Sequence, residues 1–321
     1  MHEWKTRKEF NGGGCKAIAR TSPLRLKWPA GAQDCKRMSM TEHAHIDHRA
    51  IPLFEELTWP EVDAAAKAGA PVIIALGATE GHGLHLPLGT DTYQGLDMCR
   101  RAAAVLKAES IDLVVGPAIP FGPPPFLSES PRSFPGTIAV SNNTLRALTD
   151  DVCRSLIDAG FRRLYLLLAN VESEYAMHIV AKELTEVTDA NIVTLNWLIG
   201  IRHHYRGVLR SSRPQGHGGE GETARMLATA PHLVRMDKAR SYHPSLPESP
   251  PVQGDALPYL GGAIGRYRFD GPEFEGFEDG ITGDPQLATA EVGEKSYALI
   301  AEWIASVIRH DTKARSGSKG S

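Results

Sequence analysis

The chain has 321 residues, of which 42% are hydrophobic and 23% are charged, and this balance excludes a largely disordered or fibrous protein. Its 35 Lys and Arg residues against 38 Asp and Glu residues give a net charge of −3, without the basic excess typical of nucleic-acid binding proteins. No apolar run approaches the roughly 20 residues that a membrane-spanning helix needs. We therefore expect a globular protein without nucleic-acid or membrane partners.

The chain begins with a basic segment. Residues 1–37 carry nine Lys or Arg and three Asp or Glu residues, a net charge of +6, and lack the apolar core of a secretory signal. The segment could be a transit-like sequence, a regulatory tail or sequence upstream of a later start at Met38 or Met40. We expect a basic, disordered extension over residues 1–48, one folded domain over residues 49–311 and a flexible Gly/Ser-rich tail over residues 312–321.

Cysteine usage indicates a reducing compartment. The four cysteines, Cys15, Cys35, Cys99 and Cys153, form no CxxC pair and are too sparse for a disulfide-stabilised secreted protein. We therefore expect buried or bystander thiols and a cytoplasmic location.

From residue 51 onward, short apolar runs alternate with longer segments of helical periodicity. Strands are predicted at residues 71–76, 111–115, 163–168 and 192–197. Helices are predicted at residues 92–109, 142–159, 174–187, 221–230 and 286–309. Fully apolar strands separated by helices are typical of a parallel sheet covered on both faces. The sequence therefore predicts the α/β class, as a three-layer α/β/α sandwich with a mostly parallel central sheet. Residues 240–285, rich in proline and glycine, interrupt this rhythm and are predicted to be a lid or an oligomer arm.

Polar, metal-ligating side chains follow the first predicted strand. The run GATEGHGLHLPLGTD at residues 77–91 contains Glu80, His82, His85 and Asp91. Glu, His and Asp side chains this close together can converge on a divalent metal ion. The alternative is a polar turn in which an acid or threonine caps the next helix.

Two further acidic segments are predicted to lie close to the polar run at residues 77–91. Glu172 and Glu174 follow the third strand, and the glycine-rich run HGGEGET, with His217 and Glu222, leads into a helix. Each alone could be a set of acids at a helix N-terminus, which the helix dipole favours. Because functional groups in parallel sheets gather beyond the strand carboxyl ends, the coincidence of three such segments favours a metal centre.

For patterns of other enzyme classes, the sequence contains one weak match and two informative absences. The run HAHIDH at residues 43–48 fits the HxHxDH pattern of metallo-β-lactamase-like hydrolases, but no apolar strand precedes it. The chain contains neither the GxxxxGK[ST] pattern of a P-loop nor the GxSxG pattern of a serine hydrolase.

Four segments resemble one known family. The run GATEGHGLHLPLGTDT resembles TEQHGPHLPLGTD of the creatininase family of metal-dependent amidohydrolases. FPGT at residues 134–137, HGGEGET at 217–223 and GDPQLATAEVGEK at 283–295 are similar to three further segments of that family, in the same order. The resemblance extends from about residue 53 to residue 308 and implies an α/β/α fold, two divalent metal ions per chain and a homohexamer.

The resemblance also implies roles for individual residues. Glu80, His82 and Asp91 match metal ligands, with Asp91 in the bridging position, and Glu174 matches a ligand of the second ion. His217 and Glu222 match the catalytic pair, in which His217 is the acid/base and Glu222 either orients it or helps to bind metal.

The sequence departs from the family pattern at two places. The family's NGH is Asn170-Val171-Glu172 here, so Glu172 stands at a histidine ligand position and is predicted to bind metal. The Glu-His pair that precedes FPGT in the family is absent from residues 128–134. An additional carboxylate suits Mn better than an imidazole-rich set would, yet Mn, Zn and Fe all stay open as the metal. The second departure leaves the substrate open and gives creatinine itself no support.

We therefore predict a metal-dependent hydrolase of a small polar molecule, with a cyclic amide or another non-peptide C–N bond as its target. A metal-bound hydroxide would attack the carbonyl, and His217 would pass a proton to the departing nitrogen. Two alternatives on the same fold are hydrolysis of a C–C bond in a cyclic polyol ketone and deformylation of a pyrimidine. An alternative from another class is a binding or scaffold protein with a decayed site.

Overall fold

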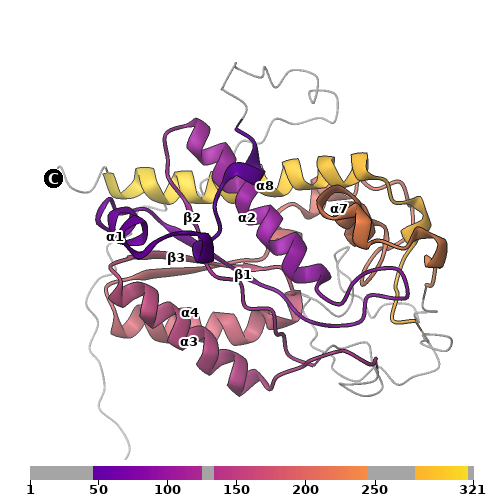
Figure 1. Cartoon of the computed structure of the whole chain (residues 1–321), viewed down its shortest axis with the longest axis horizontal. Helices are drawn as coiled ribbons and strands as arrows, with labels where there is room; N and C mark the ends of the chain where they lie inside the picture. Colours follow the sequence, from indigo (N-terminus) through magenta and orange to yellow (C-terminus); the bar gives the residue numbers. More distant parts are fainter. Residues whose placement is uncertain (1–45, 125–133, 244–278, 317–321) are drawn as a thin grey trace, which may run out of the picture. The chain divides into compact units, whose positions relative to one another are not determined.

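The computed structural model of the chain describes residues 46–124, 134–243 and 279–316 (Figure 1). Most of the predicted extension and of the predicted arm, and the segment that differs from the family before FPGT, lie outside these ranges. The described residues belong to one compact unit that spans residues 43–321.

The centre of the fold is a sheet of four parallel strands. They are β1 (Val72–Leu76), β2 (Val114–Val115), β3 (Arg163–Leu168) and β4 (Asn191–Leu195), in the spatial order β2-β1-β3-β4. In register, Val72 of β1 lies between Val114 of β2 and Leu164 of β3. All five residues of β1 are buried, because helices cover both faces of a parallel sheet.

Eight α-helices surround the sheet in the described part of the chain. They are α1 (Trp59–Lys67), α2 (Thr90–Ala108), α3 (Asn142–Asp158), α4 (Glu174–Val187), α5 (Trp197–Gly200), α6 (Arg202–Tyr205), α7 (Glu220–Thr229) and α8 (Ala290–Ser316). Short 3₁₀ turns join them, among them η2 (His48–Ala50) and η4 (Val171–Ser173).

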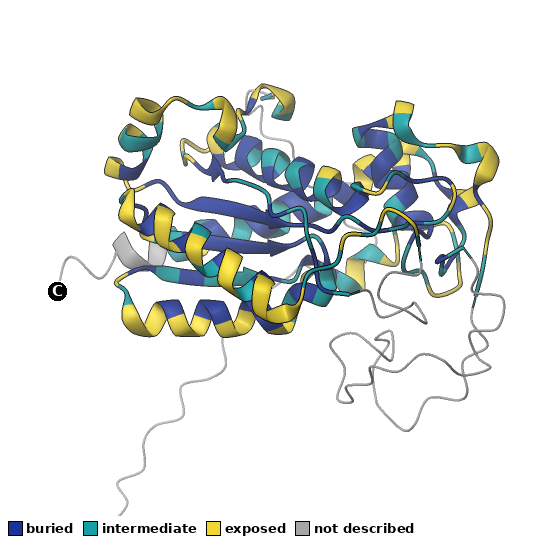
Figure 2. Cartoon of the chain, turned by 60° about the horizontal axis from the view of Figure 1, so that its bottom comes forward, coloured by how far each residue is buried: buried dark blue, intermediate teal, exposed yellow. Residues whose placement is uncertain are grey.

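The alternation of side chains along each strand divides the core into two layers. Ile73 and Ala75 of β1 pack with residues of α2 and α8, whereas Val72 and Ile74 pack with residues of α1, α3 and α4. Figure 2 shows the buried strands between helices whose outer faces are exposed. The predicted three-layer α/β/α sandwich with a parallel sheet is confirmed.

Some element boundaries differ from those predicted. Helix α1 was not predicted, although Thr58 and Glu61 form the capping box that begins it. Strand β4 ends at Leu195 rather than at residue 197, since the Asn196 side chain caps α5. Helix α8 continues to Ser316, so residues 312–316 of the predicted tail are helical. At the other end, Ile46 packs against the core and His48 pairs with Asp97, so the folded part begins before residue 49.

Among the described residues, no helix combines the length and the apolar character needed to cross a membrane.

Candidate metal centre

The candidate site lies where the order of the strands changes direction. The chain passes from β1 to β2 on one side and returns to β3 on the other, so the loops after β1 and β3 leave the sheet side by side. Crevices at such points are the usual binding sites of parallel α/β sheets. The loop after β1 is closed at its base, because the Glu80 amide donates to the Leu88 carbonyl oxygen (3.0 Å).

His82 lies at the centre of the site and is almost fully buried. Its Nε2 lies 3.1 Å from Asp91 Oδ1, 3.6 Å from Glu222 Oε2 and 3.9 Å from Glu80 Oε1. Three carboxylates from the β1 loop, the start of α2 and the start of α7 therefore face one imidazole nitrogen.

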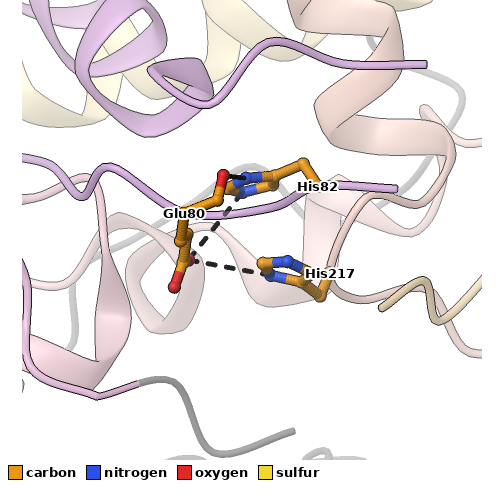
Figure 3. Close-up of side chains that lie close together, drawn as sticks. All are labelled: Glu80, His82 and His217. Atoms are coloured by element: carbon orange, nitrogen blue, oxygen red, sulfur yellow. Dashed lines mark hydrogen bonds and ion pairs between the residues drawn. The ribbon is translucent and has the colours of Figure 1, made fainter. Parts of the chain in front are cut away.

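His217 completes a second group of donors with Glu80 and His82 (Figure 3). The two imidazole rings stack with their centroids 4.1 Å apart, and His217 Nδ1 lies 3.8 Å from Glu80 Oε1. His217 Nε2 lies 2.6 Å from the Gly81 carbonyl oxygen. Since a carbonyl oxygen only accepts hydrogen bonds, Nε2 carries the proton and neutral His217 offers the lone pair of Nδ1 toward Glu80.

The sequence reasoning missed Asn170, which joins the acids of two loops. This buried side chain follows β3, and its Nδ2 donates to Glu80 Oε1 (3.2 Å) and to Asp91 Oδ2 (3.1 Å). The signal was present in the sequence, because Asn170 precedes Glu172 at a strand end. An amide that donates to both carboxylates holds the two acids close together.

The start of α7 positions Glu222. The Gly218 amide donates to Glu222 Oε2 (2.7 Å), and Gly218 has a φ of +62°, a conformation that glycine adopts without strain. The glycine-rich run therefore folds back and orients the carboxylate toward His82.

The electrostatics of the site reflect crowded carboxylates. Burial, followed by the charges of Asp91 and Glu172, raises the pKa of Glu80 well above its ordinary value. Burial alone would lower the pKa of His82, but Asp91, Glu222 and Glu80 raise it to about 10. Burial would raise the pKa of Asp91, but the His82 charge outweighs it and lowers that pKa. The site therefore attracts positive charge in the ion-free protein.

Two observations fit this donor set to metal ions. Glu80, His82 and His217 form one group, and His82, Asp91 and Glu222 form another, each with donor atoms within 4.8 Å of one another. Glu80 Oε2 is a buried polar atom without a hydrogen-bond partner among the described residues, and the buried His82 Nε2 faces only carboxylates, the nearest being Asp91 at 3.1 Å. Buried polar atoms are seldom left unpartnered, and a divalent cation would satisfy both.

The two other predicted ligands lie differently. The Glu172 charge acts on Glu80, so this carboxylate lies near the cluster. Glu174 Oε1 instead accepts from Asn196 Nδ2 (3.0 Å) and lies 3.6 Å from His178 Nε2. His85, the remaining polar residue of the β1 loop, is fully buried and bonds to Thr223 of α7. The structure thus brings together five of the predicted residues, namely Glu80, His82, Asp91, His217 and Glu222. Glu172 lies close to them, whereas Glu174 contacts Asn196 and His178 instead.

The chain is similar to known proteins of one family. The model of a protein family described as creatininase, creatinine amidohydrolase, matches residues 55–308. The chain is 28% identical over 274 residues to the creatinine amidohydrolase of Pseudomonas putida, and the aligned region covers 80% of this chain and 95% of that protein. It is 27% identical to a mycofactocin precursor peptide peptidase of Mycobacterium tuberculosis, over 79% of this chain and 91% of that one. It is 25% identical to the 3-dehydro-scyllo-inosose hydrolase of Thermotoga maritima, over 80% of this chain and 82% of that one.

Solved structures show the same fold. A crystal structure of creatinine amidohydrolase superposes with a TM-score of 0.65 at 24% identity and covers 81% of this chain and 97% of its own. A creatininase structure described with Mn gives a TM-score of 0.62 at 26% identity, over 81% of this chain and 98% of that one.

Proposed function

Because the chain belongs to the creatininase family of metal-dependent amidohydrolases, we propose that it hydrolyses a C–N bond of a small, cyclic molecule at the site around His82. The convergence of five donor side chains, with the buried Glu80 Oε2 left without a hydrogen-bond partner among the described residues, is the observation that carries this proposal. When bound, divalent ions lower the pKa of a coordinated water and polarise a carbonyl group.

The residues divide into those that would hold ions and those that would move protons. Glu80, His82 and Asp91 would hold the ions, and His82 is the member that the two groups of donors share. Asn170 keeps Glu80 and Asp91 at a fixed separation through its two hydrogen bonds.

His217 is the proposed general acid/base. Its Nε2–H is bound to the Gly81 carbonyl oxygen, which fixes the ring and leaves Nδ1 to exchange protons on the side of Glu80. Burial and the His82 charge lower the pKa of His217, so the ring is neutral and able to accept a proton near pH 7. Glu222, held by the Gly218 amide, either orients this region or joins the ligands.

We propose that Glu172 and Glu174 complete the set for a second ion. The Glu172 charge already acts on Glu80, which supports a place for this carboxylate at the edge of the cluster. Glu174 would have to leave Asn196 and His178. Four carboxylates with His82 favour Mn, while Zn and Fe stay open.

The test combines metal content with a substrate panel. Purified full-length protein is expected to contain close to two divalent ions per chain, and near-zero content after loading with Mn, Zn or Fe would support a scaffold instead. Hydrolysis of lactams, hydantoins, formamides, an inosose-type ketone and a short peptide would then be compared. The last two probes follow the inosose hydrolase and the peptide peptidase among the relatives. His217→Asn should abolish turnover, and its metal content shows whether His217 acts only on protons or also binds an ion with Glu80 and His82.

We also propose a cytoplasmic homohexamer. Large apolar side chains stay exposed around the β1 loop, at Leu84, Leu88, Tyr93 and Ile138, and such a group on one region favours contact with another subunit. Sedimentation at micromolar concentration should give about six chains, and a monomer would exclude this assembly.

A further inference from the structure

The β1 loop and α7 are joined by a hydrogen bond that lies outside the metal-ligating cluster. His85 Nε2 lies 2.8 Å from Thr223 Oγ1, and both side chains are fully buried. Thr223 Oγ1 also donates to the Gly218 carbonyl oxygen (3.3 Å). Because the hydroxyl has a single proton, His85 Nε2–H must be the donor to Thr223.

A histidine that makes the His85–Thr223 hydrogen bond destabilises the fold more than an ordinary core residue would. His85 Nδ1 is buried without a hydrogen-bond partner among the described residues, which costs free energy. An apolar side chain of similar size would avoid that cost, so packing alone does not explain a histidine here. Burial, with the nearby His82 charge, lowers the pKa of His85 to about 4, so the ring is neutral at pH 7.

The His85–Thr223 hydrogen bond is connected to the candidate metal centre through the residues on either side of it. His82 lies between two fixed points of its loop, Gly81, which accepts from His217, and His85, which donates to Thr223. Thr223 is adjacent to Glu222, and Gly218 bonds to both of these residues. The His85–Thr223–Gly218 chain therefore sets the separation between His82 on one loop and Glu222 on the other.

We propose that His85 and Thr223 are positioning residues whose hydrogen bond holds the two halves of the metal centre at binding distance. The proposal rests on the proposed function, since it concerns the readiness of that site for metal. The two residues touch neither substrate nor ion and act through Gly218 and Glu222.

The test removes the hydroxyl without changing side-chain size. Thr223→Val should bind Mn or Zn about tenfold more weakly than wild type, as is common when a group that orients metal ligands is lost. Thr223→Ser, which keeps the hydroxyl, should stay within about twofold of wild type. Thr149→Val is the matched control, because Thr149 is equally buried and donates to the Leu145 carbonyl oxygen in α3, on another layer.

A second readout uses the metal-free protein. The imidazole signals of His82 and His217 in ¹⁵N-histidine-labelled protein should shift in Thr223→Val and stay in place in Thr149→Val. If Thr223→Val does not fold, His85→Gln, which keeps a donor, is compared with His85→Leu, which has none. Only the leucine variant should show weaker metal binding and shifted signals.

The outcomes separate this proposal from the proposed function. Equal metal affinity and equal imidazole signals in the valine variants at positions 223 and 149 would overturn the positioning role while the metal centre stands. A wild-type protein that binds no divalent ion would overturn the proposed function, and the imidazole signals alone would then decide the positioning role.

Discussion

The loops after β1 and β3 leave neighbouring strands, yet they contribute to the site in different ways. The β1 loop and the start of α2 bring the carboxylates of Glu80 and Asp91 within 4.0 Å of His82 Nε2, at 3.9 and 3.1 Å. The β3 loop contributes Asn170 directly, while Glu174 stays bonded to Asn196.

Charge contributes to the difference. In the β1 half of the site, formed by Glu80, His82 and Asp91, the His82 cation offsets the acids around it, so the cluster is assembled in the absence of an ion. In the β3 half, formed by Asn170, Glu172 and Glu174, the Glu172 charge adds to that of Asp91 in disfavouring the charged form of Glu80. Opposite charges thus stabilise the β1 half without an ion, and we expect a bound cation to draw the acids of the β3 half inward.

The largest effect is expected from breaking the preassembled half. Asp91→Asn removes the acid that lies 3.1 Å from His82 Nε2 and that we propose as a metal ligand. We expect metal affinity and turnover to fall by about 100-fold or more, since an amide is a much weaker ligand than a carboxylate. Metal analysis and kinetics measure both quantities. Asp151→Asn, on the exposed side of α3, is the control and should behave as wild type.

Metal removal should have the next largest effect, on stability. An ion present at about 100 times its dissociation constant stabilises the native state by about 2.7 kcal/mol. For a chain of this size that corresponds to a rise in Tm of roughly 4–5 °C. Thermal unfolding with a chelator and with added Mn or Zn measures the shift, and Asp91→Asn should show almost none. Equal Tm values for the chelated and loaded wild-type protein would contradict a metal centre in the β1 half.

The β1 half was largely predictable from the sequence, and so was the fold. Apolar runs and helical periodicity gave the strand regions and the α/β/α sandwich, because burial on both faces leaves a clear pattern. The family resemblance is confirmed by the match over residues 55–308. Glu80, His82 and Asp91 lie within one short run, so their convergence depends on a single loop.

The β3 half was less predictable, because it depends on side-chain orientation. Two acids two residues apart, Glu172 and Glu174, take different partners, and the partners of Glu174 come from later segments of the chain. The sequence showed Asn170 beside these acids but gave no sign that its amide reaches Glu80 and Asp91. The His85–Thr223 bond joins residues 138 positions apart, which no local pattern reveals.

Substitutions in the β3 half test whether its acids bind metal. Glu172→His restores the family's residue and should shift the preference between Mn and Zn toward Zn by about tenfold, because imidazole suits Zn. Metal competition and metal-dependent turnover measure the shift. Unchanged preference, stoichiometry and rate would place Glu172 outside the set of ligands.

Glu174→Gln should weaken metal binding less than Glu172→Gln does, by about threefold against about tenfold. Glu174 must give up its contacts with Asn196 and His178 before it reaches an ion, and that loss offsets part of its contribution. Isothermal titration of both variants measures the order. Glu186→Gln, an exposed position on the same helix, is the control, and a reversed order would mean that Glu174 leaves its partners readily.

The smallest effect concerns the pH dependence of stability and returns to the β1 half. In the folded protein, burial and then the His82 charge lower the pKa of His85 to about 4, below the value of about 6.5 of an exposed histidine. The unfolded chain therefore takes up a proton first as the pH falls. The contribution of His85 to stability is complete above pH 6.5 and is lost as the pH falls from 6.5 toward 4. Between pH 7 and pH 5 this linkage gives an expected loss of about 1–2 kcal/mol.

Carboxylates also titrate in this range, so the measurement is the difference between wild type and His85→Gln, by urea unfolding with a chelator. That difference should change in favour of the glutamine variant as the pH falls. A difference that stays constant from pH 7 to pH 5 would mean that His85 is protonated at little cost, and that its ring is not held in the buried, neutral state in which it donates to Thr223.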